Sequence, residues 1–121
     1  MAGIIEHDNI IYISYISEIG GVETFAYELA KKYKDRDVAV VCKTIHPSQL
    51  KRLSNICWVY RHTDQYIKCK TAIINYDTSI INFICDEAEI YMTIHADYEH
   101  NFYKNKFPQH QRIKSYIGIT K

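Results

Sequence analysis

The sequence contains few of the residues that interrupt helices and strands, proline and glycine. Its 121 residues include two prolines and four glycines, and no linker, internal repeat or low-complexity tract divides them. A chain of this length forms one domain and buries roughly two thirds of its unfolded surface. We therefore expect a single compact domain over residues 1–121, with a core that needs no disulfide bonds.

The sequence also lacks an excess of charge of either sign. Its formal net charge is +1 at pH 7, which gives no global field that would attract nucleic acid or an anionic membrane. Basic residues do cluster at Lys31–Lys34 and again from Lys104 to Lys106. Such short runs are most simply solvated faces, and the first suits the end of a helix. We expect no nucleic-acid partner.

Signals for secretion and for disulfide bonding are missing as well. The four cysteines, Cys42, Cys57, Cys69 and Cys85, form no C-x-x-C pair, and at least three lie in apolar runs. A free thiol in such a run behaves as a small hydrophobic group, which suits a reducing compartment. Residues 1–9 do not resemble a signal peptide, and no stretch approaches 18 uninterrupted apolar residues. These features predict a cytoplasmic protein.

Six short apolar runs are present, each rich in Ile, Val and Tyr. Most are apolar nearly throughout rather than alternating, which is typical of strands covered on both faces in a parallel sheet. We expect strands at Ile10–Tyr15, Val38–Cys42, Ile56–Tyr60, Ala72–Tyr76, Ile90–His95 and Tyr116–Thr120.

Helical patterns lie between these runs. Apolar residues recur at helical spacing from Val22 to Tyr33, and Pro47–Leu53 can form a short helix with proline in its first turn. Asp77-Thr78 can cap a helix over Ser79–Ile84, and Pro108–Lys114 can form another. Residues 63–70 are ambiguous. Strands alternating with helices predict an α/β fold, namely a Rossmann-like, doubly wound, mainly parallel sheet of about six strands.

Ligands of doubly wound sheets gather outside the carboxyl ends of the strands. Ser17, Glu18, Gly20 and Gly21 follow the first expected strand. The glycine pair, placed before a helix N-terminus, is suited to a phosphate or a sugar, although a tight turn without a ligand explains it equally well. G-x-G-x-x-G and G-x-x-x-x-G-K-[ST] are both absent, which argues against a dinucleotide site and a P-loop.

His95 ends the fifth expected strand and is followed by a polar loop. A single histidine there is often a hydrogen-bonded structural residue, but a neutral imidazole can also donate to a sugar hydroxyl. Asp97 in the loop could bind acceptor hydroxyls or simply solvate the loop. Tyr98 could offer its aromatic face to a sugar or belong to the core with a polar tip. His95 and His100 lack the i, i+4 spacing of a helical metal pair, and we expect no metal.

Three segments together resemble the N-terminal domain of retaining GT-B glycosyltransferases of the family 4 type. Residues 20–30, Gly-Gly-Val-Glu-Thr-Phe-Ala-Tyr-Glu-Leu-Ala, are similar to that family's G-G-x-E…L-A segment. Residues 94–97 resemble its element of an apolar strand followed by histidine. Residues 116–121 resemble its late strand followed by Ser-Lys or Ser-Glu, with Thr120 in place of the serine.

The resemblance implies a two-domain enzyme of which this chain is the acceptor-side half. Gly20 and Gly21 would lie against the donor diphosphate or the transferred sugar, and His95 would hydrogen-bond that sugar from the acceptor side. Glu18, Asp97 and Tyr98 would be the weaker acceptor contacts. The family needs no metal or other cofactor beyond its nucleotide-sugar donor.

The expected partners are a C-terminal nucleotide-sugar-binding domain and a saccharide or lipid-linked acceptor. A lipid-linked acceptor would leave room for peripheral membrane association of the full-length enzyme. The sequence stops at Lys121, directly after an expected strand, so we expect a longer protein whose donor half is absent here. The alternatives are a non-catalytic acceptor-binding subunit of a split glycosyltransferase and a Rossmann-like domain without sugar chemistry.

Overall fold

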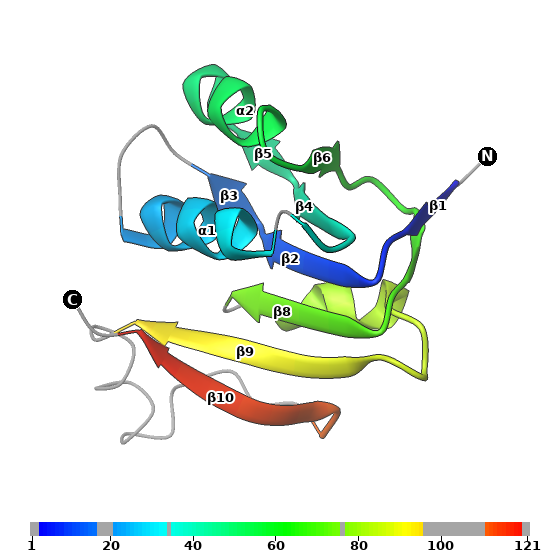
Figure 1. Cartoon of the computed structure of the whole chain (residues 1–121). Coiled ribbons are helices and arrows are strands. Elements are labelled where there is room, and N and C mark those ends of the chain that lie inside the picture. The colour runs from blue at the N-terminus through cyan, green and yellow to red at the C-terminus, as the bar shows by residue number, and fades with distance from the viewer. Residues whose placement is uncertain (1–2, 17–20, 34, 76, 96–110, 120–121) are drawn as a thin grey trace.

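The centre of the fold is a six-stranded sheet (Figure 1). A computed structural model describes residues 3–16, 21–33, 35–75, 77–95 and 111–119. For residues 21–26, 94–95 and 116–119 it describes the backbone but not the side chains. Every neighbouring pair of strands in the sheet is parallel. Its strands are β2 (Asn9–Ile13), β4 (Val38–Cys42), β6 (Trp58–Arg61), β8 (Thr71–Asn75), β9 (Glu89–His95) and β10 (Ile113–Ile119).

The order of the strands confirms the predicted α/β fold with a parallel sheet of six strands. Across the sheet the order is β10-β9-β8-β2-β4-β6. The first three strands in sequence thus run outward to one side and the last three to the other, which is the Rossmann-like order. The order reverses between β2 and β8, which pair directly, for example Ile11 with Ile73.

Two pairs of short strands extend beyond the sheet, and the sequence did not predict them. β1 (Ile4–Glu6) pairs in parallel with β7 (Tyr66–Lys68), which assigns part of the ambiguous 63–70 segment. β3 (Tyr15–Ile16) pairs with β5 (Thr44–Ile45). The latter pair continues β2 and β4 past the carboxyl edge of the sheet.

The described part of the chain contains three helical segments between its strands. α1 (Gly21–Lys32) carries basic residues in its last turn, where they oppose the negative end of the helix dipole. α2 (Pro47–Ser54) has proline in its first turn and is capped by His46, whose ring accepts from the backbone N–H of Ser48 at 3.2 Å. The third, η1 (Thr78–Phe83), is a 3-10 helix capped by Asp77, close to the predicted position.

The sheet separates two apolar cores, as the apolar runs predicted. Alternate residues of β2 point to opposite faces. Ile11 and Ile13 pack with Ala30 of α1 and Leu53 of α2, and Ile10 and Tyr12 pack with residues of η1. Figure 1 shows α1 and α2 together on one face of the sheet. β4 is buried at every position and β2 at all but its first, because both faces of these two central strands are covered.

The cysteines belong to these cores. Cys42, Cys69 and Cys85 are buried, Cys57 is half-buried, and all four are free thiols. Burial raises the pKa of Cys42 and Cys57 to about 11 and that of Cys69 to about 12. Their environment confirms that they act as small hydrophobic groups in the core.

The helix predicted over Pro108–Lys114 is wrong at its end, because Ile113 and Lys114 belong to β10. The guanidinium of Arg112 fixes the start of this strand by donating to the carbonyl of Ile84 at 3.1 Å and to that of Cys85 at 2.7 Å. Lys114 then reaches across to β9, with its Nζ 2.5 Å from Oε2 of Glu89. These long-range contacts hold residues 113 and 114 in the sheet, and residues 108–110 of the predicted helix lie outside the described residues.

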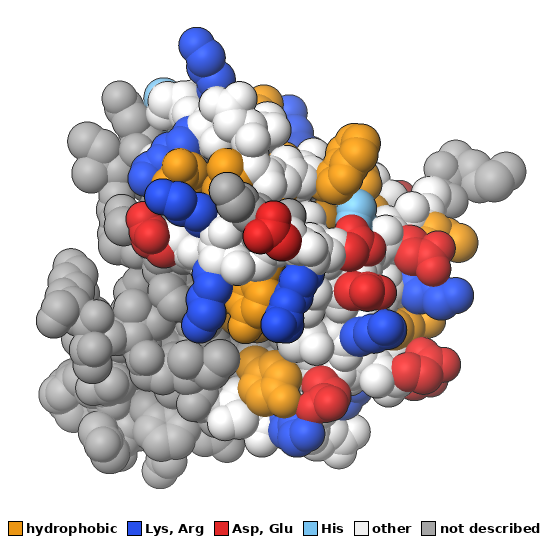
Figure 2. Space-filling model, in the orientation of Figure 1, with side chains coloured by type: hydrophobic (Ala, Val, Ile, Leu, Met, Phe, Trp, Pro, Cys, Tyr) orange, Lys and Arg blue, Asp and Glu red, His pale blue; other side chains and the backbone are white. Residues whose placement is uncertain are grey.

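The described surface mixes both signs of charge. Figure 2 shows acidic and basic side chains interspersed over the face that it draws. In the described part of the chain, no helix is long and apolar enough to cross a membrane.

Candidate functional site

The carboxyl edge of the sheet, at the reversal between β2 and β8, is where an open α/β sheet holds its ligand. Ser14 follows β2, Lys43 follows β4 and Asp77 follows β8. α1 begins at Gly21, after β3 has extended the chain past the same edge, and β9 ends there at His95. The candidate site is therefore assembled from the ends of several different strands.

The structure describes only part of the site that the sequence predicts. Gly21 is the first residue of α1, so its backbone N–H is among those that lack a partner within the helix. The backbone of His95 ends β9, as predicted, while its side chain lies outside the description. The remaining predicted contacts lie outside the described residues, namely Glu18, Gly20, Asp97 and Tyr98.

Asp77 is the best-connected polar group at this edge. Its Oδ1 accepts from the backbone N–H of Ser79 at 3.0 Å and from the Ser79 hydroxyl at 2.6 Å. Its Oδ2 accepts from the Tyr12 hydroxyl at 3.0 Å and lies 3.4 Å from Nζ of Lys43. A carboxylate has about four acceptor positions. The chain itself therefore fills those of Asp77.

These contacts fix the charge state of Asp77 and Tyr12. Burial opposes ionisation of Asp77, but the hydrogen bonds from Ser79 and Tyr12 and the charge of Lys43 lower its pKa. Burial, followed by the hydrogen bond to Asp77, raises the pKa of the fully buried Tyr12. Asp77 is thus a carboxylate that ties β2, β4 and η1 together. Because both of its oxygens already have partners, Asp77 is better suited to a structural role than to that of a catalytic base.

Lys43 also lies at this edge, and the sequence did not predict it as a site residue. Its backbone N–H donates to the carbonyl of Ser14 at 3.0 Å, which places it beside the segment that leads from β2 toward α1. Its ammonium is half exposed and lies 3.4 Å from the Ser79 hydroxyl. An ammonium held in this way can also bind an anionic ligand group. Its position directly after the buried run Val38–Cys42 was the available signal.

A second polar pair joins β8 to β9 near the carboxyl edge. The side-chain amide of Asn75 donates to the hydroxyl of Thr93 at 2.9 Å, and that hydroxyl donates to the carbonyl of Ile74 at 3.3 Å. Thr93 is buried and lies two residues before His95. This pair fixes the backbone from which His95 emerges.

Among the described residues, no group of three His, Cys, Asp or Glu side chains is arranged to hold a metal ion. The functional groups described at the carboxyl edge are thus a hydrogen-bonded carboxylate, an ammonium, hydroxyl and amide groups, and the N-terminus of α1.

No family model, curated protein or solved structure matches the chain. The functional interpretation therefore depends on the strand order, the groups at the carboxyl edge and the motifs of the sequence.

Proposed function

We propose that this chain is the acceptor-side, N-terminal domain of a retaining GT-B glycosyltransferase. The enzyme would transfer a sugar from a nucleotide-sugar donor to a saccharide or glycolipid acceptor. The single observation that carries the proposal is that Gly21 and His95, from two separate family-like motifs, belong to one edge of a Rossmann-like sheet. It is the edge at which such sheets bind their ligands.

The start of α1 supports a contact with the donor. The N–H groups of a helix's first turn and its partial positive charge stabilise an anion placed there. Glycine at positions 20 and 21 lets a diphosphate or sugar approach the backbone without a Cβ in the way. Lys43 joins this side of the site in the proposal, because it is bonded to the strand segment that leads toward α1.

His95 takes the role of a hydrogen-bonding group for the transferred sugar. During transfer, the anomeric carbon exchanges its bond to a diphosphate oxygen for a bond to an acceptor hydroxyl oxygen, and the proton of that hydroxyl passes to the departing nucleoside diphosphate. Positive charge develops at the anomeric carbon, and fixed dipoles aimed at the sugar lower the energy of that state. Glu18, Asp97 and Tyr98 would contact the acceptor.

The donor would be held mainly by a second, nucleotide-sugar-binding domain. In the first form of the proposal that domain belongs to the same polypeptide. In the second form this chain is an acceptor-binding subunit that docks on a separate donor-binding chain. A reading frame that continues after Lys121 with a second Rossmann pattern and a paired-glutamate motif supports the first form. A stop codon there supports the second.

The test is to assay residues 1–121 with and without the donor-binding part. We expect no nucleoside diphosphate release by residues 1–121 alone, and release when the two parts are together. Sugar transfer by residues 1–121 alone would overturn the proposal that a second domain must hold the donor. Release by the donor-binding part that is unchanged when this domain is omitted would overturn an acceptor-side role.

A further inference from the structure

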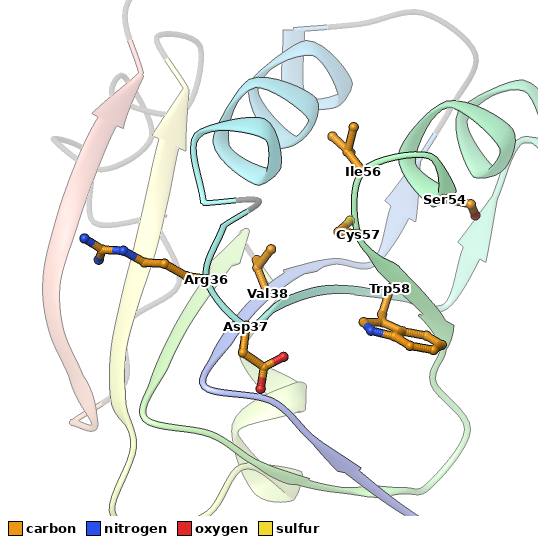
Figure 3. A pocket seen from close by; sticks show the side chains of 7 residues that line it. All are labelled: Arg36, Asp37, Val38, Ser54, Ile56, Cys57 and Trp58. Carbon is orange, nitrogen blue, oxygen red and sulfur yellow. The ribbon is translucent and has the colours of Figure 1, made fainter.

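A pocket of about 360 Å³ lies at the amino edge of the sheet, opposite the candidate site. It is lined at the starts of β4 and β6 and by the end of α2 and the residues after it (Figure 3). Its lining residues include the apolar Val38 and Ile56, the acidic Asp37 and the aromatic Trp58. Figure 3 shows Asp37 directly before β4 and Trp58 at the start of the neighbouring strand β6.

Trp58 presents a large apolar face to solvent. It is 65% exposed, although it begins a strand of the central sheet. Its ring is braced by His7, with ring centroids 6.2 Å apart, and His7 is itself buried beside the ring of Tyr60 at 5.4 Å. An aromatic face held in this way can pack on a ligand at little cost in side-chain entropy.

Asp37 is held in an equally fixed position. Its Oδ1 lies 2.5 Å from Nδ1 of His7, and its Oδ2 accepts from the backbone N–H of Asp8 at 3.0 Å. A carboxylate only accepts, so Nδ1 of His7 donates to Asp37, and Nε2 of the same ring lies 2.8 Å from the Tyr60 hydroxyl. The side chain of Asp37 is 45% exposed, and each oxygen retains room for a further donor.

The lining of the pocket combines polar groups with apolar side chains. Asp37 already receives the His7 N–H, and the adjacent residue, Arg36, carries the opposite charge. The Arg36 guanidinium lies over the Tyr33 ring, 5.6 Å from its centroid, and Figure 3 shows its side chain directed away from Trp58. The pocket thus offers one aromatic face, one oriented acceptor and apolar side chains. A pyranose combines the matching features, because it has an apolar ring face and a rim of hydroxyl donors.

We propose that this pocket is a saccharide-binding site that holds a neutral pyranose residue, with its ring face on Trp58 and its hydroxyls donating to Asp37. The site is separate from the carboxyl edge and does not depend on sugar transfer there.

Trp58 is the only tryptophan of the chain, so its fluorescence reports on this pocket alone. The experiment titrates the full chain with the methyl α-pyranosides of glucose, galactose and mannose. Choline and inorganic phosphate serve as cationic and anionic probes. We expect a saturable change with at least one pyranoside, with a dissociation constant of about 1 mM, in the weak range of specific binding.

Variants separate the pocket from the rest of the surface. Asp37→Asn should weaken binding of the responding pyranoside about tenfold, equivalent to about 1.4 kcal/mol, while the exposed control Asp86→Asn should leave it unchanged. Trp58→Ala removes the reporter, so its binding is followed by amide NMR shifts, which should no longer saturate. The same spectra show whether each variant keeps its fold.

Three results would overturn the proposal. They are the absence of a saturable response to any pyranoside, a response to choline or phosphate but to no pyranoside, and pyranoside binding that Asp37→Asn leaves intact in a folded protein.

Discussion

Replacing Asp77 tests whether the carboxyl edge is held together as described. The carboxylate joins three parts of the fold: it caps η1 through Ser79, accepts from Tyr12 in β2 and pairs with Lys43 after β4. The side chain of Tyr12 is fully buried, so its hydroxyl loses its hydrogen-bond partner in the protein when Asp77 is removed. Asp77→Ala should therefore lower the free energy of unfolding substantially.

The magnitude follows from the separate contacts. Loss of a cap costs about 1 kcal/mol, and a buried hydroxyl without a partner costs about 1–3 kcal/mol. Lys43 is half exposed, and its ion pair adds less than about 1 kcal/mol. We expect Asp77→Ala to destabilise the chain by about 2–4 kcal/mol, against less than about 0.5 kcal/mol for the exposed control Asp86→Ala.

The assay is urea unfolding of the two single variants Asp77→Ala and Tyr12→Phe and of the double variant. Because Tyr12→Phe removes the stranded hydroxyl, Asp77→Ala should cost about 1–2 kcal/mol less in that background. The same loss in both backgrounds would refute the contact between the two side chains.

The pH dependence has a definite sign. The pKa of Asp77 is lower in the folded chain than in the unfolded one, so its contribution is present above the unfolded value and is lost as the pH falls through the folded one. The stability difference between the wild type and Asp77→Asn should therefore be largest near neutral pH and shrink below about pH 4. A difference that grows on acidification would contradict this.

Three further predictions concern other parts of the fold. In the complete enzyme, His95→Ala should lower turnover at least tenfold, about 1.4 kcal/mol of transition-state stabilisation, and unchanged turnover would remove the role proposed for it. His7→Phe should lower the free energy of unfolding by about 1–3 kcal/mol in urea, because it removes the shared partner of a carboxylate and a tyrosine hydroxyl, and an unchanged midpoint would argue against that cluster. Burial raises the pKa of Cys42 to about 11 and of Cys69 to about 12, so the folded chain should react with Ellman's reagent at pH 8 far more slowly than the urea-unfolded chain, and equal rates would show that the thiols are accessible.

The sequence predicted the sheet well because burial on both faces leaves a strong local signal. Val38–Cys42 is apolar throughout and forms β4 with the predicted bounds. Ile56 belongs to the predicted third strand, but its backbone N–H donates to the carbonyl of Leu53 at 3.0 Å. It therefore closes α2, and the strand begins at Trp58.

The short strands could not be predicted from local pattern. β1 and β7 have three residues each, and Ile4 and Tyr66, which pair with one another, are both exposed. Such strands exist through pairing across more than sixty residues of sequence, as the register from Ile4 to Tyr66 shows. A short window of sequence holds no information on that pairing.

The same limit applies to the polar clusters. The capping role of Asp77 was predicted because Ser79 lies two residues away, whereas its contact with Tyr12 spans 65 residues. The contact of His7 with Asp37 spans 30 residues, and residues 1–9 gave no sign of it. Local spacing thus predicted the contact of Asp77 with Ser79. Its contacts with Tyr12 and Lys43 became visible only in the folded structure.

The most direct test of the proposed function is sugar transfer by the complete enzyme. Residues 1–121 with their donor-binding part would be incubated with UDP-glucose, UDP-galactose, UDP-N-acetylglucosamine or GDP-mannose and an extract of saccharide and glycolipid acceptors. The account predicts release of nucleoside diphosphate from at least one donor and a product that retains the donor's anomeric configuration. No release from any of these donors, or a product of inverted configuration, would contradict it.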